Sequence, residues 1–145
     1  MPTLFRGFSQ RLATPEQSNI FYHIPRAPRN TDLRIHRIAD AWFFEAFGVR
    51  ARSSALICST DFSQANSYGA TYRIYPDAPA VMIYSSSVKD FHELERDLGE
   101  HNESNIIKWL TQKNFKMVSS SEEIDSKLLG EVMVICETYK ALPRT

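Results

Sequence analysis

Hydrophobic and polar residues follow a helical period over one long stretch of the chain. Between residues 31 and 48 the apolar positions recur every three to four residues, which predicts an amphipathic helix. Asn30 or Thr31 can cap its start, and Gly48 can end it. The apolar side of this helix comprises Ile35, Ile38, Ala39, Trp42, Phe43 and Ala46.

Elsewhere the pattern predicts short strands and short helices. Apolar or alternating runs predict strands over 19–24, 53–60, 71–75, 80–84, 115–118 and 131–136. Shorter helices are expected over 61–68, 90–98, from 104 onward and over 120–130. The strands and helices are interspersed without regular alternation, which favours an α+β fold over a doubly wound sheet.

Length and composition are those of one globular domain. The chain has 145 residues, of which 43% are hydrophobic and 23% charged, and we expect a single domain over 1–145. Its uncharged apolar runs are far shorter than the roughly 20 residues that span a bilayer. The N-terminus lacks the cationic and apolar regions of a secretory signal. We therefore expect a cytoplasmic protein with no membrane partner.

Charge is distributed unevenly between the two parts of the chain. Residues 1–60 contain eight arginines and four acids, whereas residues 61–145 carry an excess of acids that brings the total to zero. Every cation before Lys89 is an arginine, whose planar group of donors suits phosphate and carboxylate oxygens. The bias indicates an anion site in the first part, or simply solvated surface charge.

Several common functional motifs are absent from the sequence. It contains no GxGxxG after a predicted strand, no GxxxxGK[ST] and no GxSxG. The four histidines show no metal-ligand spacing, and we expect no metal. Cys58 and Cys136 lie in apolar runs, which is typical of reduced thiols in a core.

Three polar segments stand at or near the ends of predicted strands. Glu131 opens an apolar strand and shares a face with Met133 and Ile135, where a carboxylate is costly unless it has a partner. It could instead lie at an edge in water or in an ion pair. The other two segments are Ser59-Thr60 and the stretch from Tyr22-His23 to Arg26 and Arg29.

This constellation resembles the toxin-type ADP-ribosyltransferases. Tyr22-His23, followed by Arg26-Ala27-Pro28-Arg29, is similar to the aromatic-Arg or aromatic-His pair on the family's first strand and the turn after it. The second motif, a Ser-Thr-Ser strand end, resembles Leu56-Ile57-Cys58-Ser59-Thr60 with Ala65 and Tyr68-Gly69. Gly130-Glu131-Val132-Met133-Val134 is similar to the strand with the catalytic Glu. More specifically, the chain is similar over about 21–142 to small bacterial and phage proteins that share the motifs RxPRxT and FGVRxRS.

The resemblance implies a mono-ADP-ribosyltransferase that uses NAD as its substrate, without a metal. It would transfer ADP-ribose to a protein or nucleic-acid acceptor and release nicotinamide, in a mixed, mostly antiparallel split sheet with flanking helices. A toxin or effector role in bacteria or phage, with an antitoxin or inhibitor protein as partner, is also implied. In this scheme Glu131 is catalytic, and the residues that bind NAD are His23, Arg26, Arg29, Ser59 and Thr60.

The chain departs from the family pattern in identifiable places. Asp61 replaces the third residue of the Ser-Thr-Ser pattern, and Leu129 stands where a Glu or Gln often selects an arginine acceptor. Phe5-Arg6-Gly7 competes with the later segment as the first-strand motif. Tyr68 or Tyr72 could stack on nicotinamide or belong to the core. The alternative function is a non-catalytic nucleotide- or nucleic-acid-binding domain of the same fold.

Overall fold

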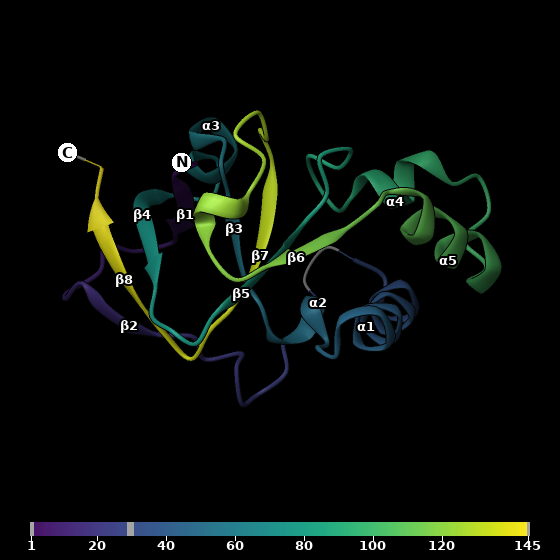
Figure 1. The fold of residues 1–145 in the computed structure, drawn as a ribbon, viewed down its shortest axis with the longest axis horizontal. Helices are drawn as coiled ribbons and strands as arrows, with labels where there is room; N and C mark the ends of the chain where they lie inside the picture. Colours follow the sequence, from purple (N-terminus) through teal and green to yellow (C-terminus); the bar gives the residue numbers. More distant parts are fainter. Residues whose placement is uncertain (1, 29–30, 145) are drawn as a thin grey trace.

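A computed structural model describes residues 2–28 and 31–144, in which eight strands form one open sheet (Figure 1). The order across the sheet is β2-β8-β4-β1-β3-β7-β5-β6, and every strand pair in the described residues is antiparallel. The α+β class is therefore confirmed. The strands are β1 (Leu4–Phe8), β2 (Glu16–Ser18), β3 (Leu56–Ser59), β4 (Ala70–Pro76), β5 (Val81–Tyr84), β6 (Lys116–Val118), β7 (Glu131–Ile135) and β8 (Thr138–Pro143).

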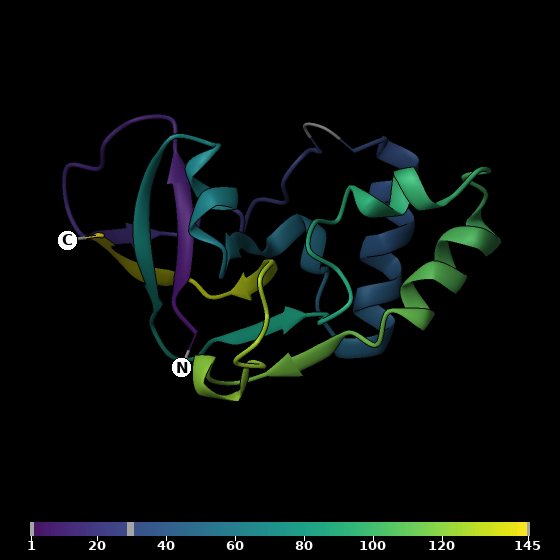
Figure 2. The same ribbon diagram turned by 90° about the horizontal axis from the view of Figure 1, so that it is seen from above.

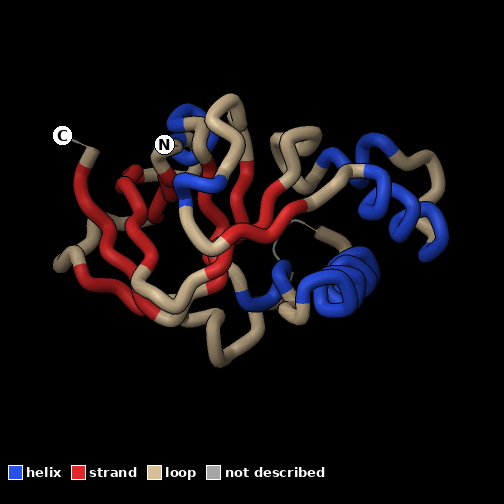
Figure 3. Tube along the Cα trace, in the orientation of Figure 1, coloured by secondary structure: helices blue, strands red, loops and turns tan. Residues whose placement is uncertain are grey.

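The helices are arranged in two places around the sheet. Figures 1 and 2 show α1, α4 and α5 gathered toward one end of the molecule, with α2 between α1 and the strands, whereas α3 lies beside β1. Figure 3 shows the same separation, with helices in blue and strands in red. The helical elements are α1 (Leu33–Phe47), α2 (Ala51–Ser54), α3 (Phe62–Asn66), α4 (Glu93–Asp97), α5 (Glu103–Gln112) and a 3-10 turn, η1 (Ser121–Glu123).

Helix α1 forms where the apolar period predicted it. The Asp32 carboxylate caps its start by accepting the backbone N–H groups of Arg34 and Ile35. Asp32 therefore replaces the expected cap at Thr31, while Asn30 lies outside the described residues. Gly48 ends the helix in the left-handed conformation at φ 81°, as expected.

Two apolar clusters cover opposite faces of the sheet. Met133 and Ile135 of β7 pack with α1, α4 and α5, and Val132 and Val134 pack in the second cluster. This alternation places Glu131 at the end of the strand on the helical side, as predicted. Both cysteines are buried free thiols of the second cluster.

The prediction of a strand over 19–24 is wrong, because the segment forms a turn. The buried Asn19 side chain donates to the backbone oxygens of Ser54 and Cys136, both at 3.0 Å. Its Oδ1 accepts the N–H of Phe21, and its backbone oxygen accepts the N–H of Tyr22. These local bonds replace a strand ladder despite the β-favouring side chains.

Other boundaries differ from the sequence-based expectations. Ser53 and Ser54 belong to the one-turn helix α2, because Ser53 bonds back to Arg50 and to the Asp40 side chain, and the strand begins only at Leu56. The helix expected over 120–130 is only the turn η1. Strands β2 and β8 were not predicted, and β1 was anticipated only through the competing motif Phe5-Arg6-Gly7. Across residues 2–28 and 31–144, no helix has both the length and the apolar composition needed to cross a membrane.

Candidate functional site: an arginine-lined cavity

The sheet opens between β1 and β3. These two strands share a single residue pair, Phe5 with Ser59, whereas β1 pairs with β4 along its whole length. The Arg6 side chain crosses the gap and donates from Nη1 to the backbone oxygen of Ile57 at 2.8 Å. A side-chain donor thus takes the place of a ladder hydrogen bond, which holds the guanidinium at the junction.

A cavity of about 370 Å³ lies over this junction. Its walls come from β1, β3, β7, the start of α1, α2, α3, and the segments around residues 26 and 90. Three guanidinium groups and two carboxylates line it, together with two imidazoles. These side chains are Arg6, Arg26, Arg52, Asp90, Glu131, His36 and His92.

Glu131 enters the cavity from the first position of β7 and is paired with Arg52. The distance from Arg52 Nη1 to Glu131 Oε2 is 2.6 Å, and these side chains are only 13% and 15% exposed. The Arg52 guanidinium also lies over the Phe91 ring, 4.1 Å from its centroid. The partner that a carboxylate needs at this position is therefore supplied by the helical turn α2.

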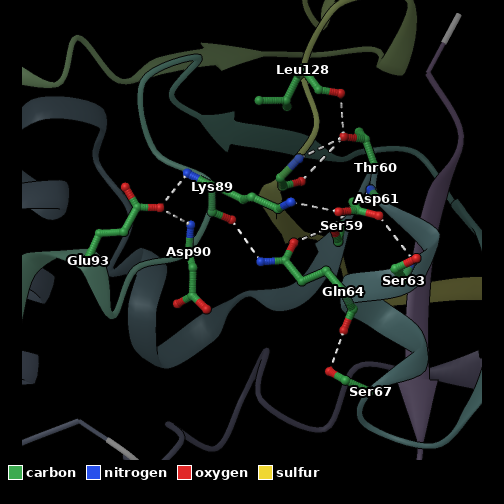
Figure 4. A network of polar contacts seen from close by, with 11 residues as sticks. Ser59, Thr60, Asp61, Ser63, Gln64, Ser67, Lys89, Asp90, Glu93 and Leu128 are labelled. Carbon is green, nitrogen blue, oxygen red and sulfur yellow. Dashed lines mark hydrogen bonds and ion pairs between the residues drawn. The ribbon is translucent and has the colours of Figure 1, made fainter.

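Ser59 lies directly opposite Glu131 in the β3–β7 ladder. Its hydroxyl donates to Gln64 Oε1 at 2.5 Å and accepts the backbone N–H of Asp61 at 3.0 Å. Gln64 in turn donates to the backbone oxygen of Lys89 at 2.9 Å (Figure 4). Ser59 and Gln64 both line the cavity, so this bond ties α3 to the floor of the site.

Thr60 faces the segment that leads into Glu131. Its hydroxyl donates to the backbone oxygen of Leu128 at 2.6 Å and accepts the N–H of Gly130 at 3.1 Å (Figure 4). Its own N–H donates to the Gly130 oxygen at 2.9 Å. Thr60 is not among the described residues that line the cavity. It therefore supports the backbone that leads into Glu131 and does not contact the space where a ligand would bind.

The loop before Glu131 is anchored on a second side by residues 88–89. The Glu131 N–H donates to the Lys89 oxygen at 3.0 Å. A Cβ added at Gly130 would lie 2.8 Å from Lys89 Cα and 3.2 Å from the Val88 oxygen. Glycine is therefore required for this approach of two backbones. Lys89 itself pairs with Asp61 at 2.9 Å, and Asp61 caps α3 (Figure 4).

Arg26 reaches the cavity from the segment after the Asn19 turn. Its N–H donates to the Ser53 oxygen at 3.0 Å, and its guanidinium lies 4.0 Å from the centroid of the Phe21 ring. Burial, followed by repulsion from Arg6 and Arg52, lowers the pKa of Arg26 to about 10. This lowered pKa reports an excess of positive charge in a poorly hydrated site.

His23, which was also expected to bind NAD, does not lie in this cavity. The His23 side chain is 71% exposed and pairs with Glu137 at 2.7 Å, and it is not among the described residues that line the cavity. The turn over 19–24 carries it away from a strand position. Arg29 lies outside the described residues. Tyr68 lines the cavity and is 59% exposed. Tyr72 instead packs against the second apolar cluster, where its hydroxyl accepts the Leu12 N–H.

Arg52 and His36 are cavity residues that sequence reasoning missed, and Arg6 was only a competing assignment. Arg6 Nε is buried and has no hydrogen-bond partner among the described residues, which leaves a donor available beside the cavity. The arginine bias of residues 1–60 was a signal for the arginines of this set, and it did not point to His36. It could not indicate which arginines meet, since their proximity depends on the strand order.

His36 is held in a buried polar network on α1. Ser53 Oγ donates to the Asp40 carboxylate, and His36 Nε2 lies 3.1 Å from Ser53 Oγ. Because the serine proton is used for Asp40, the imidazole donates from Nε2. Burial lowers the pKa of His36, with Arg52 and Arg26 acting in the same direction and Asp40 opposing them.

The arrangement can bind an anion and present a carboxylate beside it. Three guanidinium groups supply charge-assisted donors, while Glu131 can stabilise positive charge that develops in a ligand. Within the described residues, no group of three or more His, Cys, Asp or Glu side chains is placed to hold a metal ion.

No protein-family model, curated protein or solved structure significantly matches the chain.

Proposed function

We propose that the protein is a mono-ADP-ribosyltransferase with an ADP-ribosyltransferase-like fold and that NAD is its substrate. The observation that carries the proposal is the meeting of Arg6, Ser59 and Glu131. These residues come from the neighbouring strands β1, β3 and β7 and line one cavity. An arginine, a hydroxyl and a carboxylate are the three chemical groups that the family resemblance requires at strand positions.

The charge in the cavity suits the diphosphate of NAD. Arg6 and Arg26 are proposed to bind its oxygens, because arginine forms strong paired hydrogen bonds to phosphate. The free Nε donor of Arg6 and the lowered pKa of Arg26 both support an anionic ligand. The volume of about 370 Å³ lies within the range of small-molecule sites.

Glu131 is proposed to act on the nicotinamide ribose. The bond from ribose C1′ to the nicotinamide nitrogen breaks, and its electron pair leaves with nicotinamide. Positive charge then spreads over C1′ and the ring oxygen, as in the oxocarbenium-like transition state of glycoside cleavage. A carboxylate fixed beside that charge stabilises it. The acceptor group donates an electron pair to C1′ and loses a proton.

The other cavity residues are proposed to orient the substrate. Ser59 would bond to the nicotinamide ribose next to Glu131, and Tyr68 would stack on nicotinamide at the rim of the cavity. The acceptor is proposed to be a protein or nucleic acid in the bacterial cytoplasm. Modification of such an acceptor would make the protein a toxin or effector, and a neutralising protein partner would be expected.

Incubation with labelled NAD and a bacterial lysate tests the proposal. Wild type should release nicotinamide and label a macromolecule. Glu131→Gln should reduce the rate about 10²–10³-fold, the usual cost of losing one such electrostatic contact. Equal activity of wild type and Glu131→Gln, or no nicotinamide release from either, would reject the catalytic assignment.

One observation favours a second candidate, a non-catalytic nucleotide- or nucleic-acid-binding domain. In this structure Glu131 is already engaged in an ion pair with Arg52. This candidate predicts tight NAD binding in calorimetry without nicotinamide release. A nucleic-acid ligand would instead show affinity that falls steeply as salt is raised.

A further inference from the structure

Arg52 is held in the cavity by two contacts that use only part of its guanidinium. Nη1 bonds to Glu131 at 2.6 Å, and the Phe91 ring lies against the group at 4.1 Å. No other hydrogen bond of this side chain occurs within the described residues. A guanidinium has five N–H donors, so the group retains donors for another partner.

The ion pair changes what Glu131 can do. With a cation 2.6 Å from one carboxylate oxygen, much of the negative field at a nearby ribose carbon is cancelled. The pair shares the cavity with Arg6 and Arg26, and the positive charges of Arg26 and Arg52 repel each other. Glu131 therefore stabilises a cluster of like charges. Among the described residues it is the carboxylate that contacts Arg52.

From this arrangement we propose that Arg52 is a third phosphate ligand and that Glu131 competes with the ligand for it. A diphosphate in the cavity offers Arg52 more negative charge than one carboxylate and draws it away from Glu131. The carboxylate is then left free to stabilise positive charge on the ribose. Binding of the substrate's diphosphate thereby frees the Glu131 carboxylate from its ion pair. This inference rests on the proposed function, because it requires a phosphate-bearing ligand.

Binding of inorganic pyrophosphate, measured by calorimetry at low salt, tests the competition. Glu131→Gln frees Arg52 and should bind pyrophosphate about fivefold to tenfold more tightly than wild type. Asp90→Asn is the matched control, because it removes another carboxylate of the cavity that has no contact with Arg52 among the described residues. It should change the affinity by less than about twofold.

A double-mutant cycle separates competition from general charge effects. In the Arg52→Gln background, the gain from Glu131→Gln should fall to that of Asp90→Asn. Arg52→Lys serves as the second variant should Arg52→Gln fail to fold, and it should reduce the gain because lysine lacks the planar donor group. Thermal unfolding of each variant checks that the fold is retained.

The outcomes distinguish this inference from the proposed function. The inference is overturned when Glu131→Gln binds pyrophosphate no more tightly than Asp90→Asn. It is also overturned when the full gain persists without Arg52. When neither wild type nor any variant binds pyrophosphate, the phosphate site itself is absent, and the proposed function fails together with the inference.

Discussion

Ser59 and Glu131 face each other across the antiparallel strands β3 and β7. The backbone ladder fixes this relationship, since directly opposed residues have Cα atoms about 4.5–5.5 Å apart. Ser59 is also the one residue of β3 that pairs with β1, so Arg6 follows immediately on the next strand. The sheet order therefore brings an arginine, a hydroxyl and a carboxylate together from positions 6, 59 and 131.

Thr60 should matter for the position of Glu131 rather than for ligand contact. Thr60→Val keeps the shape but leaves the Gly130 N–H and the Leu128 oxygen without their partner. We expect a loss of about 1–3 kcal/mol in the free energy of unfolding, measured with urea, and a lower rate of nicotinamide release. Thr60→Ser retains the hydroxyl and should remain close to wild type. Equal stability of both variants would contradict this role.

Gly130 should not tolerate a larger residue. In Gly130→Ala the new methyl group would meet Lys89 Cα at 2.8 Å and Lys89 oxygen at 3.0 Å, and these are backbone atoms that move only with the loop. We expect destabilisation of about 1–3 kcal/mol in urea unfolding, together with displacement of Glu131. Gly99→Ala is the matched control, because no atom lies within 4 Å of its added Cβ. A similar small effect of both changes would count against the close approach.

Much of the helical layer could be predicted because its signal is local. The apolar stripe of α1 needs no knowledge of its partners, and Gly48 ends it for a conformational reason confined to one residue. Glu131 was recognisable for the same reason, as a charge at the start of an apolar strand. Cys58 and Cys136 are buried free thiols as expected.

The errors arise where tertiary contacts override local preference. The side chain of Asn19 bonds to Ser54 and Cys136, which are remote in sequence, and the resulting turn moves His23 out of any strand. Arg52 lies in the single helical turn α2. The sequence did not indicate this turn, because its two serines read as the start of the strand predicted over 53–60. Arg6 joins the site only through the pairing of β1 with β3, which no sequence period encodes.

Arg6 and His23 distinguish the two possible first-strand motifs. Arg6→Ala should weaken NAD binding about tenfold or more, because it removes a charge-assisted phosphate donor inside the cavity. His23→Ala should change NAD binding by less than about twofold, since the exposed His23 side chain pairs with Glu137 and is not among the described residues that line the cavity. Calorimetric titration with NAD gives both values. A larger loss of NAD binding in His23→Ala than in Arg6→Ala would instead identify the segment after residue 19 as the binding motif.

His36 should make stability depend on pH in a defined window. Because burial lowers its pKa in the folded state, the unfolded chain takes up a proton first as the pH falls below about 6.5. The free energy of unfolding should therefore decrease between pH 7.5 and pH 5.5. Urea titrations of wild type and His36→Asn at both pH values measure this. The variant should show a smaller decrease, and an increase in wild-type stability at pH 5.5 would contradict the prediction.

We propose that Glu131, in its arginine-lined cavity, promotes the transfer of ADP-ribose from NAD to a macromolecule. Mass spectrometry of proteins and nucleic acids from bacterial cells that express wild type or Glu131→Ala tests this most directly. An ADP-ribose group attached to a macromolecule in wild-type cells, and missing in Glu131→Ala cells, is the predicted result. Matching spectra from the two cultures, with both proteins folded and equally abundant, would contradict the claim.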